Sequence, residues 1–191
     1  MRKYIIWIVL GLLVLMGFSS YNGLVSNEEA VSKAWGNVES DYQRRADLIP
    51  NLVNTVKGYA NFEKETLTKV MEARASATQV KIDASNLTPE NVAAFQQAQA
   101  GLSSALGRLL AVDENYPDLK ANQNFLGLQD ELAGTENRIN VSRQRFNDTV
   151  NEYNVSRRKF PNVLFSSILG FKEKGYFKAE AGSEKAPEVK F

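Results

Sequence analysis

The stretch YQRRADLIPNLVNTVKGYA, residues 42–60, decides how the rest of this chain folds. Two arginines and an aspartate stand directly before a dense apolar run that contains Pro50. Its apolar residues recur at steps of three and four, which is the spacing of one face of an α-helix. The stretch therefore predicts a helix that needs packing partners, with a kink just before Pro50, because proline removes a backbone donor and clashes with the preceding turn.

Upstream of this stretch, residues 4–18 read YIIWIVLGLLVLMGF and carry no charge. Extending the run through Tyr21 gives roughly 27 Å of helix at about 1.5 Å per residue, close to the ~30 Å hydrocarbon core of a bilayer. Tyr4 and Tyr21 would then lie at the two interfaces, where aromatic side chains are enriched. Residues 1–21 are therefore expected to form an uncleaved membrane anchor.

Two other interpretations of this segment stay open. A cleaved signal peptide fits the basic start and the apolar length, but Phe18 occupies a position where cleavage needs a small residue. A helix buried in a soluble protein fits less well, because no face of the run is polar. Lipoprotein processing is excluded, since the chain contains no cysteine.

The basic residues near the span predict its orientation. Arg2 and Lys3 precede the span, and the first basic residue after it is Lys33. Because lysine and arginine are enriched on the cytoplasmic side, this distribution predicts a cytoplasmic N-terminus and an extracytoplasmic body.

The rest of the chain shows helical periodicity with no strand-like alternation. Ser26 with Glu29 predicts a capping box at the start of a first body helix. Lys57 and Gly58 predict its end, and Thr88 before Pro89 predicts the cap of a later helix. The further helices are expected over residues 62–82, 88–115 and 118–159.

These elements predict an all-α fold. Amphipathic helices joined by short loops bury their apolar faces best against one another. We expect a single N-terminal transmembrane helix followed by an antiparallel four-helix up-and-down bundle. The boundaries are an anchor over 1–21, a helical bundle over 26–160, and an apolar segment with a mobile tail over 161–191.

The composition excludes several classes of function. Hydrophobic residues make up 43% of the chain and charged residues 24%, with a net charge of +1. This lacks the basic excess of a nucleic-acid-binding protein. Histidine and cysteine are both absent, which excludes a Ser-His-Asp triad, a thiol nucleophile and any metal site with those ligands. We therefore expect no enzyme activity, no cofactor, no metal and no nucleic-acid partner.

Carboxylate chemistry remains as an alternative. Glu63 with Glu65, or Asp113 with Glu114, offers oxygens to an ion binder or an enzyme. Acidic residues at helix ends also complement the helix dipole, and we prefer that interpretation.

Two charged residues interrupt the apolar stripe of the last long helix, Glu136 and Arg143. A buried charge is tolerated only when it is paired. We therefore expect structural ion pairs rather than the alternative, a ligand-binding cavity. The candidate members of these pairs are Arg44, Arg45, Arg74, Glu136 and Arg143.

Short motifs along nearly the whole chain carry a resemblance to one family. They are YNGLV at 21–25, AW at 34–35, RRADLIPNLV at 44–53, VKGY at 56–59, EKETL at 63–67, AR at 73–74, TENRI at 135–139, Arg143, YN at 153–154, FP at 160–161, GF at 170–171, YF at 176–177 and PEVKF at 187–191. By these motifs the chain resembles the LemA family of bacterial membrane-anchored proteins.

The resemblance implies one membrane helix and a four-helix bundle at the bacterial inner (cytoplasmic) membrane. It implies no settled biochemical activity, and a relative associated with magnetosome membranes favours a structural or assembly role. It also implies an N-terminus outside the cytoplasm, which opposes the orientation that Arg2 and Lys3 predict.

An up-and-down bundle returns its fourth helix to the membrane. This places Arg157, Arg158 and Lys159 at the bilayer surface, where anionic lipid attracts basic residues. The apolar stretch FPNVLFSSILGF, residues 160–171, follows directly. Its side chains, Leu164 and Ile168 among them, are expected to enter the membrane interface or contact a membrane partner; the alternative is that the stretch folds back and caps the bundle.

The last twenty residues, 172–191, are polar and are expected to be mobile. They end with Val189 and Phe191 at alternate positions, a pattern that pockets for a C-terminal carboxylate recognise by strand addition. The alternative is a tail that is disordered or packs locally.

Together these features favour a membrane-anchored helical scaffold or adaptor without catalytic activity. Its expected partners are the lipid bilayer and a protein that the sequence does not name. One alternative is a membrane-remodelling coat that self-associates into homo-oligomers. A carboxylate-based ion binder or enzyme is the other.

Overall fold

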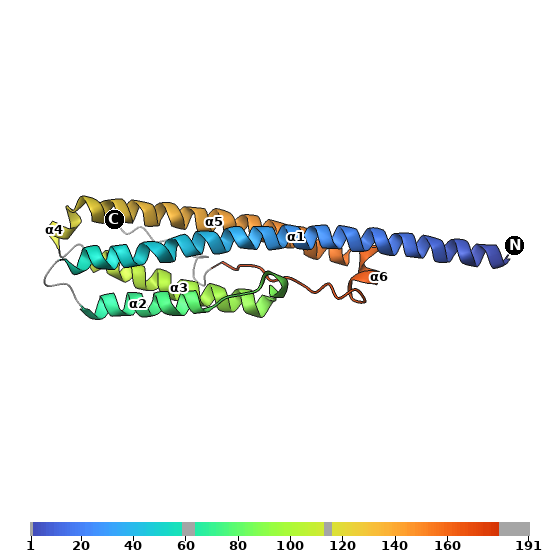
Figure 1. Cartoon of the computed structure of the whole chain (residues 1–191), viewed down its shortest axis with the longest axis horizontal. Helices are drawn as coiled ribbons and strands as arrows, with labels where there is room; N and C mark the ends of the chain where they lie inside the picture. The colour runs from blue at the N-terminus through green and yellow to red at the C-terminus, as the bar shows by residue number, and fades with distance from the viewer. Residues whose placement is uncertain (1, 59–63, 113–115, 180–191) are drawn as a thin grey trace, which may run out of the picture.

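The computed structural model of the chain describes residues 2–58, 64–112 and 116–179. One helix, α1 (Arg2–Lys57), runs through both the expected anchor and the first helix of the body (Figure 1). Residues 4–15 project from the rest of the molecule with exposed side chains. By length and composition α1 is able to cross a membrane, and no other helix in the described ranges meets that test.

The capping box predicted at Ser26 is wrong, because Ser26 lies inside α1. The buried face of α1 explains why the helix continues. Leu24 is buried and is followed at helical steps by buried Val31 and Trp35, so the same apolar stripe passes through the predicted boundary. The predicted end of this helix is confirmed, since α1 stops at Lys57 and the Gly58 N–H bonds back to the Thr55 carbonyl.

The other helices of the described ranges are α2 (Lys64–Gln79), η1 (Ala84–Asn86), α3 (Pro89–Val112), α4 (Pro117–Lys120), α5 (Gln123–Arg158) and α6 (Asn162–Ser166). The predicted start of α3 is confirmed, because it begins at Pro89 and the Thr88 hydroxyl accepts the Asn91 N–H. The single helix predicted over 118–159 is wrong at its start. Asn122 interrupts it and caps α5 by accepting the N–H groups of Asn124 and Phe125.

The described helices confirm the all-α class, with no strand among the residues that the structure covers. Their packing is concentrated in two pairs, since α1 lies along α5 and α2 lies along α3 (Figure 1). We call these four helices and α4, with α1 counted from Leu24 onward, the helical body. The closed antiparallel four-helix up-and-down arrangement stays a prediction.

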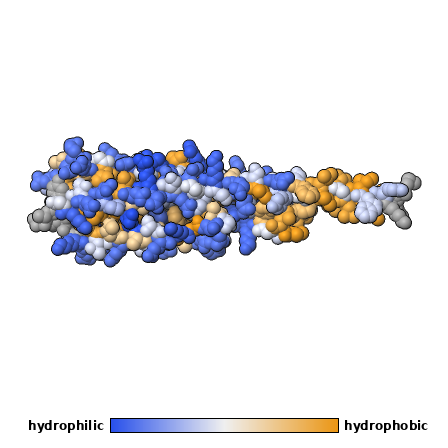
Figure 2. Space-filling view, viewed as in Figure 1, coloured by the Kyte–Doolittle hydropathy of each residue, from blue (hydrophilic) through white to orange (hydrophobic). Residues whose placement is uncertain are grey.

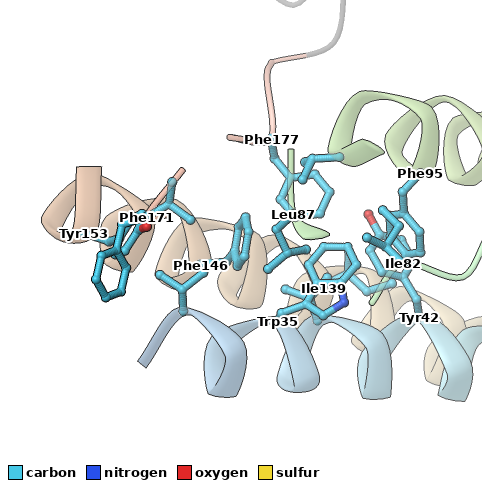
Figure 3. Close-up of a cluster of buried hydrophobic side chains, with 14 of the residues drawn as sticks. Trp35, Tyr42, Ile82, Leu87, Phe95, Ile139, Phe146, Tyr153, Phe171 and Phe177 are labelled. Carbon is cyan, nitrogen blue, oxygen red and sulfur yellow. The ribbon is translucent and has the colours of Figure 1, made fainter. Parts of the chain in front are cut away.

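Two apolar clusters fill the helical body. The cluster nearer the projecting end of α1 contains Trp35, Phe95, Phe146 and Phe177 (Figure 3). The cluster at the other end contains Leu52, Leu67, Leu102 and Phe125 among others. Along α1 the two clusters meet between Tyr42 and Ile49, along α3 between Phe95 and Leu102, and along α5 between Leu132 and Ile139.

After α6 the chain turns at Gly170, whose φ of 83° suits glycine, and residues 171–179 run back along the body without regular secondary structure. We call residues 171–179 the C-terminal strap. Phe177 inserts into the aromatic cluster, stacked on Trp35 with ring centroids 6.0 Å apart. The prediction of a mobile tail from Lys172 onward is therefore wrong for the strap. The rest of that tail, including Val189 and Phe191, lies outside the described residues.

Candidate functional site

An apolar surface lies beside α1 where this helix enters the helical body. It is formed by residues 160–170, which we call the apolar collar, and it continues the exposed apolar surface of α1 (Figure 2). Phe160 is 73% exposed, Leu164 53% and Ile168 84%. Large apolar side chains rarely gather on a surface that meets only water. The collar is therefore the most prominent candidate contact surface among the described residues.

The collar lies directly against α1. The ring of Phe165 lies 3.6 Å from the place where a Cβ on Gly17 would stand, so the glycine gives the ring its room. On the next turn Tyr21 meets Phe171 edge to face, with ring centroids 5.9 Å apart. The segment therefore folds back onto α1, while the side chains of Leu164 and Ile168 stay exposed. Its entry into the membrane interface stays a prediction.

Basic residues stand at the end of α5, directly before the collar. Arg157 makes a long contact of 3.5 Å with Glu173, and the Nε of Arg158 donates to the Asn154 carbonyl. Lys159 is exposed and ends the helix. The predicted membrane-surface residues Arg157, Arg158, Lys159, Leu164 and Ile168 belong to the end of α5, to α6 and to the residues next to it, and therefore fall at the end of the helical body from which the apolar part of α1 projects.

Amide side chains on the helices hold the C-terminal strap through its backbone. Asn154 donates to the Lys174 carbonyl at 2.9 Å and accepts the Lys174 N–H at 3.1 Å. Asn147 makes the same pair of bonds with Phe177, each at 2.9 Å. Gln96 does so with Lys178, at 2.8 and 3.0 Å. These three amides form hydrogen bonds with backbone N–H and carbonyl groups of the strap, which in a β-sheet would bond to a neighbouring strand.

Sequence reasoning missed these amide residues, and one signal points to two of them. Asn147 and Asn154 are seven residues apart, which is two turns of α5. Each directly follows a buried aromatic residue, Phe146 and Tyr153. Asparagine repeated beside a buried stripe indicates a helix face that binds another segment.

Lys174 is the buried charge of the strap, with a side chain only 4% exposed. Its ammonium group lies 2.7 Å from a carboxylate oxygen of Glu28 on α1 and 3.2 Å from the Ser85 carbonyl. Gly175 follows and passes so close to the start of α3 that a Cβ there would stand 2.6 Å from the Cα of Pro89. The strap therefore joins α1, η1, α3 and α5.

A polar layer centred on the buried Arg45 separates the two apolar clusters. It consists of Arg45, Gln99, Ser103 and Glu136. The Arg45 guanidinium donates to the Ser103 hydroxyl at 2.8 Å, to Glu136 at 2.9 Å and to the Gln99 side-chain oxygen at 2.8 Å. Gln99 in turn donates to the Ala77 carbonyl of α2 at 3.3 Å. One arginine on α1 thus connects α3 and α5 directly, and α2 through Gln99.

The other candidate ion-pair residues have different partners. Arg44 meets Glu131 at 2.8 Å on the exposed surface. Arg74 meets no carboxylate in the described residues but donates its Nε to the Ala46 carbonyl at 2.8 Å. Arg143 donates to the Lys178 carbonyl and lies over the Phe177 ring, 5.0 Å from its centroid. Of the predicted set, only Arg45 and Glu136 are brought together in the described structure.

Two buried tyrosines have shifted acidity. Burial raises the pKa of Tyr42, although the guanidinium groups of Arg143 and Arg45 act in the opposite direction. Burial and the nearby Glu28 carboxylate raise the pKa of Tyr153 to about 12, with Arg157 opposing the shift. Both hydroxyls therefore stay protonated at neutral pH, and neither is an activated base.

The carboxylate alternative receives little support from the described residues. Glu65 pairs with Lys69 at 2.6 Å, one turn along α2, while Glu63, Asp113 and Glu114 lie outside the described ranges. No group of three acidic residues in the described chain is close enough to hold a metal ion. A shallow groove of about 540 Å³ also lies between α1 and α5, where the Ser142 hydroxyl donates to Asp41.

Known proteins resemble this chain at low identity. The magnetosome protein MamQ of Magnetospirillum gryphiswaldense is 26% identical over 178 residues, covering 82% of this chain and 64% of MamQ. MamQ 2 of Paramagnetospirillum magneticum is 25% identical, covering 86% and 66% of the two chains. Protein LemA of Metamycoplasma hominis is 23% identical, covering 73% and 60%. The chain thus spans less than two thirds of each of these relatives.

A comparison with protein families matches most of the chain. The model of the LemA family matches residues 34–191, a range that holds the polar layer, the apolar collar and the strap. The chain therefore belongs to the LemA family.

Proposed function

We propose that this protein is a non-catalytic scaffold or adaptor, anchored by α1 in the bacterial inner membrane. The observation that carries the proposal is the continuity of α1 from the projecting apolar end into the core of the body. A flexible linker would let the body move freely beside the bilayer. A continuous helix instead gives the body a defined direction, which a scaffold needs to present a surface.

The internal use of polar groups supports a non-catalytic role. Arg45 and Lys174 are the most deeply buried charges of the described structure, and both are committed to contacts that hold helices together. With neither histidine nor cysteine in the sequence, the commonest general base, the thiol nucleophile and the two side chains that most often bind transition metals are missing.

We also propose that the helical body is a closed antiparallel four-helix up-and-down bundle. The polar layer supports this arrangement, because its bonds reach α1, α2, α3 and α5 at one level. A buried charged group of this kind penalises any change of register that would leave it unpaired.

We place the body on the extracytoplasmic side, on the strength of Arg2 and Lys3 before the span. Protease added to sealed spheroplasts carrying a tag after Phe191 tests this placement. Removal of the tag is expected. A tag that survives until the membrane is permeabilised would put the body in the cytoplasm and reverse the orientation.

Photo-crosslinking in living cells tests the scaffold role itself. A crosslinkable residue at exposed Val141 on α5 or Met71 on α2 samples two faces of the body, and one at buried Ile139 is the matched control. A scaffold gives a discrete crosslink to another envelope protein from one exposed face and none from position 139. Crosslinks between copies of this chain alone would favour the self-associating coat. The absence of any crosslink from both exposed faces would contradict both roles.

A further inference from the structure

We propose that the apolar collar, residues 160–170 with α6 at its centre, is a second membrane-contact element that inserts into the bilayer spanned by α1. The inference rests on the proposed anchoring by α1 and adds to it a defined depth and a defined side of the body. The position, exposure, neighbouring charge and rigidity of the collar all indicate that it contacts lipid.

The position of α6 matches the edge of the bilayer. Phe165 meets α1 at Gly17, four residues before Tyr21, at which the apolar stretch ends. If residues 4–21 span the hydrocarbon core, α6 lies roughly 6 Å inside its boundary at about 1.5 Å per residue. Interfacial helices bury their apolar faces to a depth of ~5–10 Å. The contact with α1 therefore holds the collar at an interfacial depth.

The exposure of the collar continues that of the membrane helix. Leu15 and Phe18 on α1 face outward at this level, and so do Leu164 and Ile168 of the collar. Figure 2 shows apolar surface reaching without a break from the projecting helix onto this end of the body. Continuity with the span identifies lipid as the common occupant, because a separate protein partner would not require the two surfaces to join.

The charges next to the collar fit the surface of an anionic leaflet. Arg158 and Lys159 are exposed on the body side of the apolar residues, and Lys172 is exposed where the chain leaves the collar. Glu173, which follows Lys172 in the chain, contacts Arg157 at 3.5 Å. Basic residues above inserted apolar side chains are the arrangement by which interfacial segments bind anionic lipid.

The collar is held firmly at both ends. Asn162 donates to the Ser156 carbonyl at 3.0 Å, which ties the start of α6 to α5. At the other end the Phe171 N–H bonds to the Ser166 carbonyl at 2.9 Å, and the Tyr153 hydroxyl donates to the Lys172 carbonyl at 2.8 Å. The strap then fixes the chain to the body. An apolar surface that is held outward in this way is presented to the bilayer at little cost in conformational entropy.

Spin labels on the full chain test the proposal. The chain has no cysteine, so Leu164→Cys and Ile168→Cys each give one label. Leu13→Cys reports on α1 and Val141→Cys on the exposed body. Labelled protein is reconstituted into vesicles of phosphatidylcholine with phosphatidylglycerol, and collision rates with oxygen and with a water-soluble nickel complex are measured.

The ratio of oxygen to nickel collisions is expected to be several-fold higher at 164 and 168 than at 141, and to indicate a shallower depth than at 13. Nickel access at 164 and 168 equal to that at 141, with position 13 protected, overturns the collar proposal and leaves the anchor standing. Nickel access at position 13 as well would overturn the proposed anchoring itself.

A charge variant supplies the second measurement. Arg158→Gln with Lys159→Gln is expected to reduce the immersion of the label at 168 in vesicles that contain phosphatidylglycerol, but not in phosphatidylcholine alone. The matched control is Arg145→Gln with Lys120→Gln, because both residues are exposed on the same body away from the collar. This control is expected to leave the immersion of the label at 168 unchanged. Spin–spin broadening between labels at 168 on separate chains, with protection from both relaxants, would replace lipid by a second copy and overturn the proposal.

Discussion

The Nε of Arg74 lies 2.8 Å from the carbonyl oxygen of Ala46. This is the acceptor that Pro50 leaves without its usual partner, because the residue four positions later in a helix normally donates to it and proline has no N–H. The defect that proline introduces into α1 is therefore satisfied by a side chain from α2. The helix continues past Pro50 to Lys57, and the repair also joins the two helices.

Replacing Arg74 with methionine keeps the aliphatic stem and removes the donor. Arg74→Met is expected to lower the free energy of unfolding by about 1–3 kcal/mol, the cost of an unsatisfied buried polar group. In the Pro50→Ala background position 50 donates within the helix, so the same substitution should cost less. Urea denaturation of the wild-type protein, the two single variants and the double variant in detergent micelles measures this coupling, and equal costs in both backgrounds would contradict the repair.

The pair between Arg45 and Glu136 gives a second prediction. Glu136→Gln leaves the guanidinium of Arg45 buried without its counter-charge. We expect a loss of about 2 kcal/mol, below the ~3–5 kcal/mol of fully buried pairs, because Glu136 is half-exposed and water screens its charge.

The control for this variant is the exposed pair of Arg44 and Glu131. Glu131→Gln removes the same charge on the same helix and should cost less than about 1 kcal/mol. Urea denaturation of both variants in low salt makes the comparison. Equal effects of the two glutamines would mean that the polar layer contributes no more than a surface ion pair.

The close passage of the strap over α3 predicts a strong effect at Gly175. An alanine there would place its Cβ 2.6 Å from backbone at Pro89, so Gly175→Ala should destabilise the protein by about 1–3 kcal/mol, as overpacking does. Hydrogen exchange at the Lys174 and Phe177 amides should accelerate, because their bonds to Asn154 and Asn147 weaken.

Gly127 provides the matched control, since it lies within α5 with open space around it. Gly127→Ala should stabilise the protein by up to ~1 kcal/mol through helix propensity. Unchanged exchange at Lys174 in Gly175→Ala would show that the strap adapts to the added methyl group.

The raised pKa of Tyr153 predicts a loss of stability in alkali. The unfolded chain releases this proton near pH 10, whereas the folded protein holds it to about pH 12. Below pH 10 both states bind the proton and the contribution is constant. Between the two values the unfolded state binds fewer protons, so the free energy of unfolding falls as pH rises.

Tyr153→Phe isolates this contribution. The phenylalanine has no proton to lose, although it also lacks the bond to the Lys172 carbonyl. The wild-type protein should therefore be more stable than the variant near neutral pH, and its advantage should shrink above about pH 10. Urea denaturation across this range measures it, and an advantage independent of pH would contradict the assigned shift.

Local signals in the sequence predicted much of the helical organisation. The start of α3 at Pro89 and the end of α1 at Lys57 each depend on residues close to that helix end in the sequence. Both predicted ends are confirmed. The break before α5 was missed, although Asn122 is a strong N-cap residue. Apolar residues continue at helical spacing on both sides of Asn122, so the pattern predicted one helix instead of two.

The candidate site was harder to predict, because it depends on contacts between distant segments. Arg44 and Arg45 are adjacent in the sequence, which alone does not tell which of them forms the buried ion pair. The orientation of α1 in the fold decides this, because Arg45 lies on the same buried face as Tyr42 and Ile49 while Arg44 points outward. The strap could not be anticipated from composition, since its polar backbone and Lys174 are satisfied by Asn147, Asn154 and Glu28, which are far away in the sequence.

Because α1 is one continuous helix, its tilt in the membrane also sets the position of the far end of the body. From Gly17, where the collar meets it, to its end at Lys57 the helix extends roughly 60 Å at about 1.5 Å per residue. A transmembrane helix tilts by about 20° on average, and a tilt of that size carries the far end of the body roughly 20 Å sideways. Changes in bilayer thickness that alter the tilt would thus be converted into large displacements of the far end of the body around α4, the end most distant from the membrane.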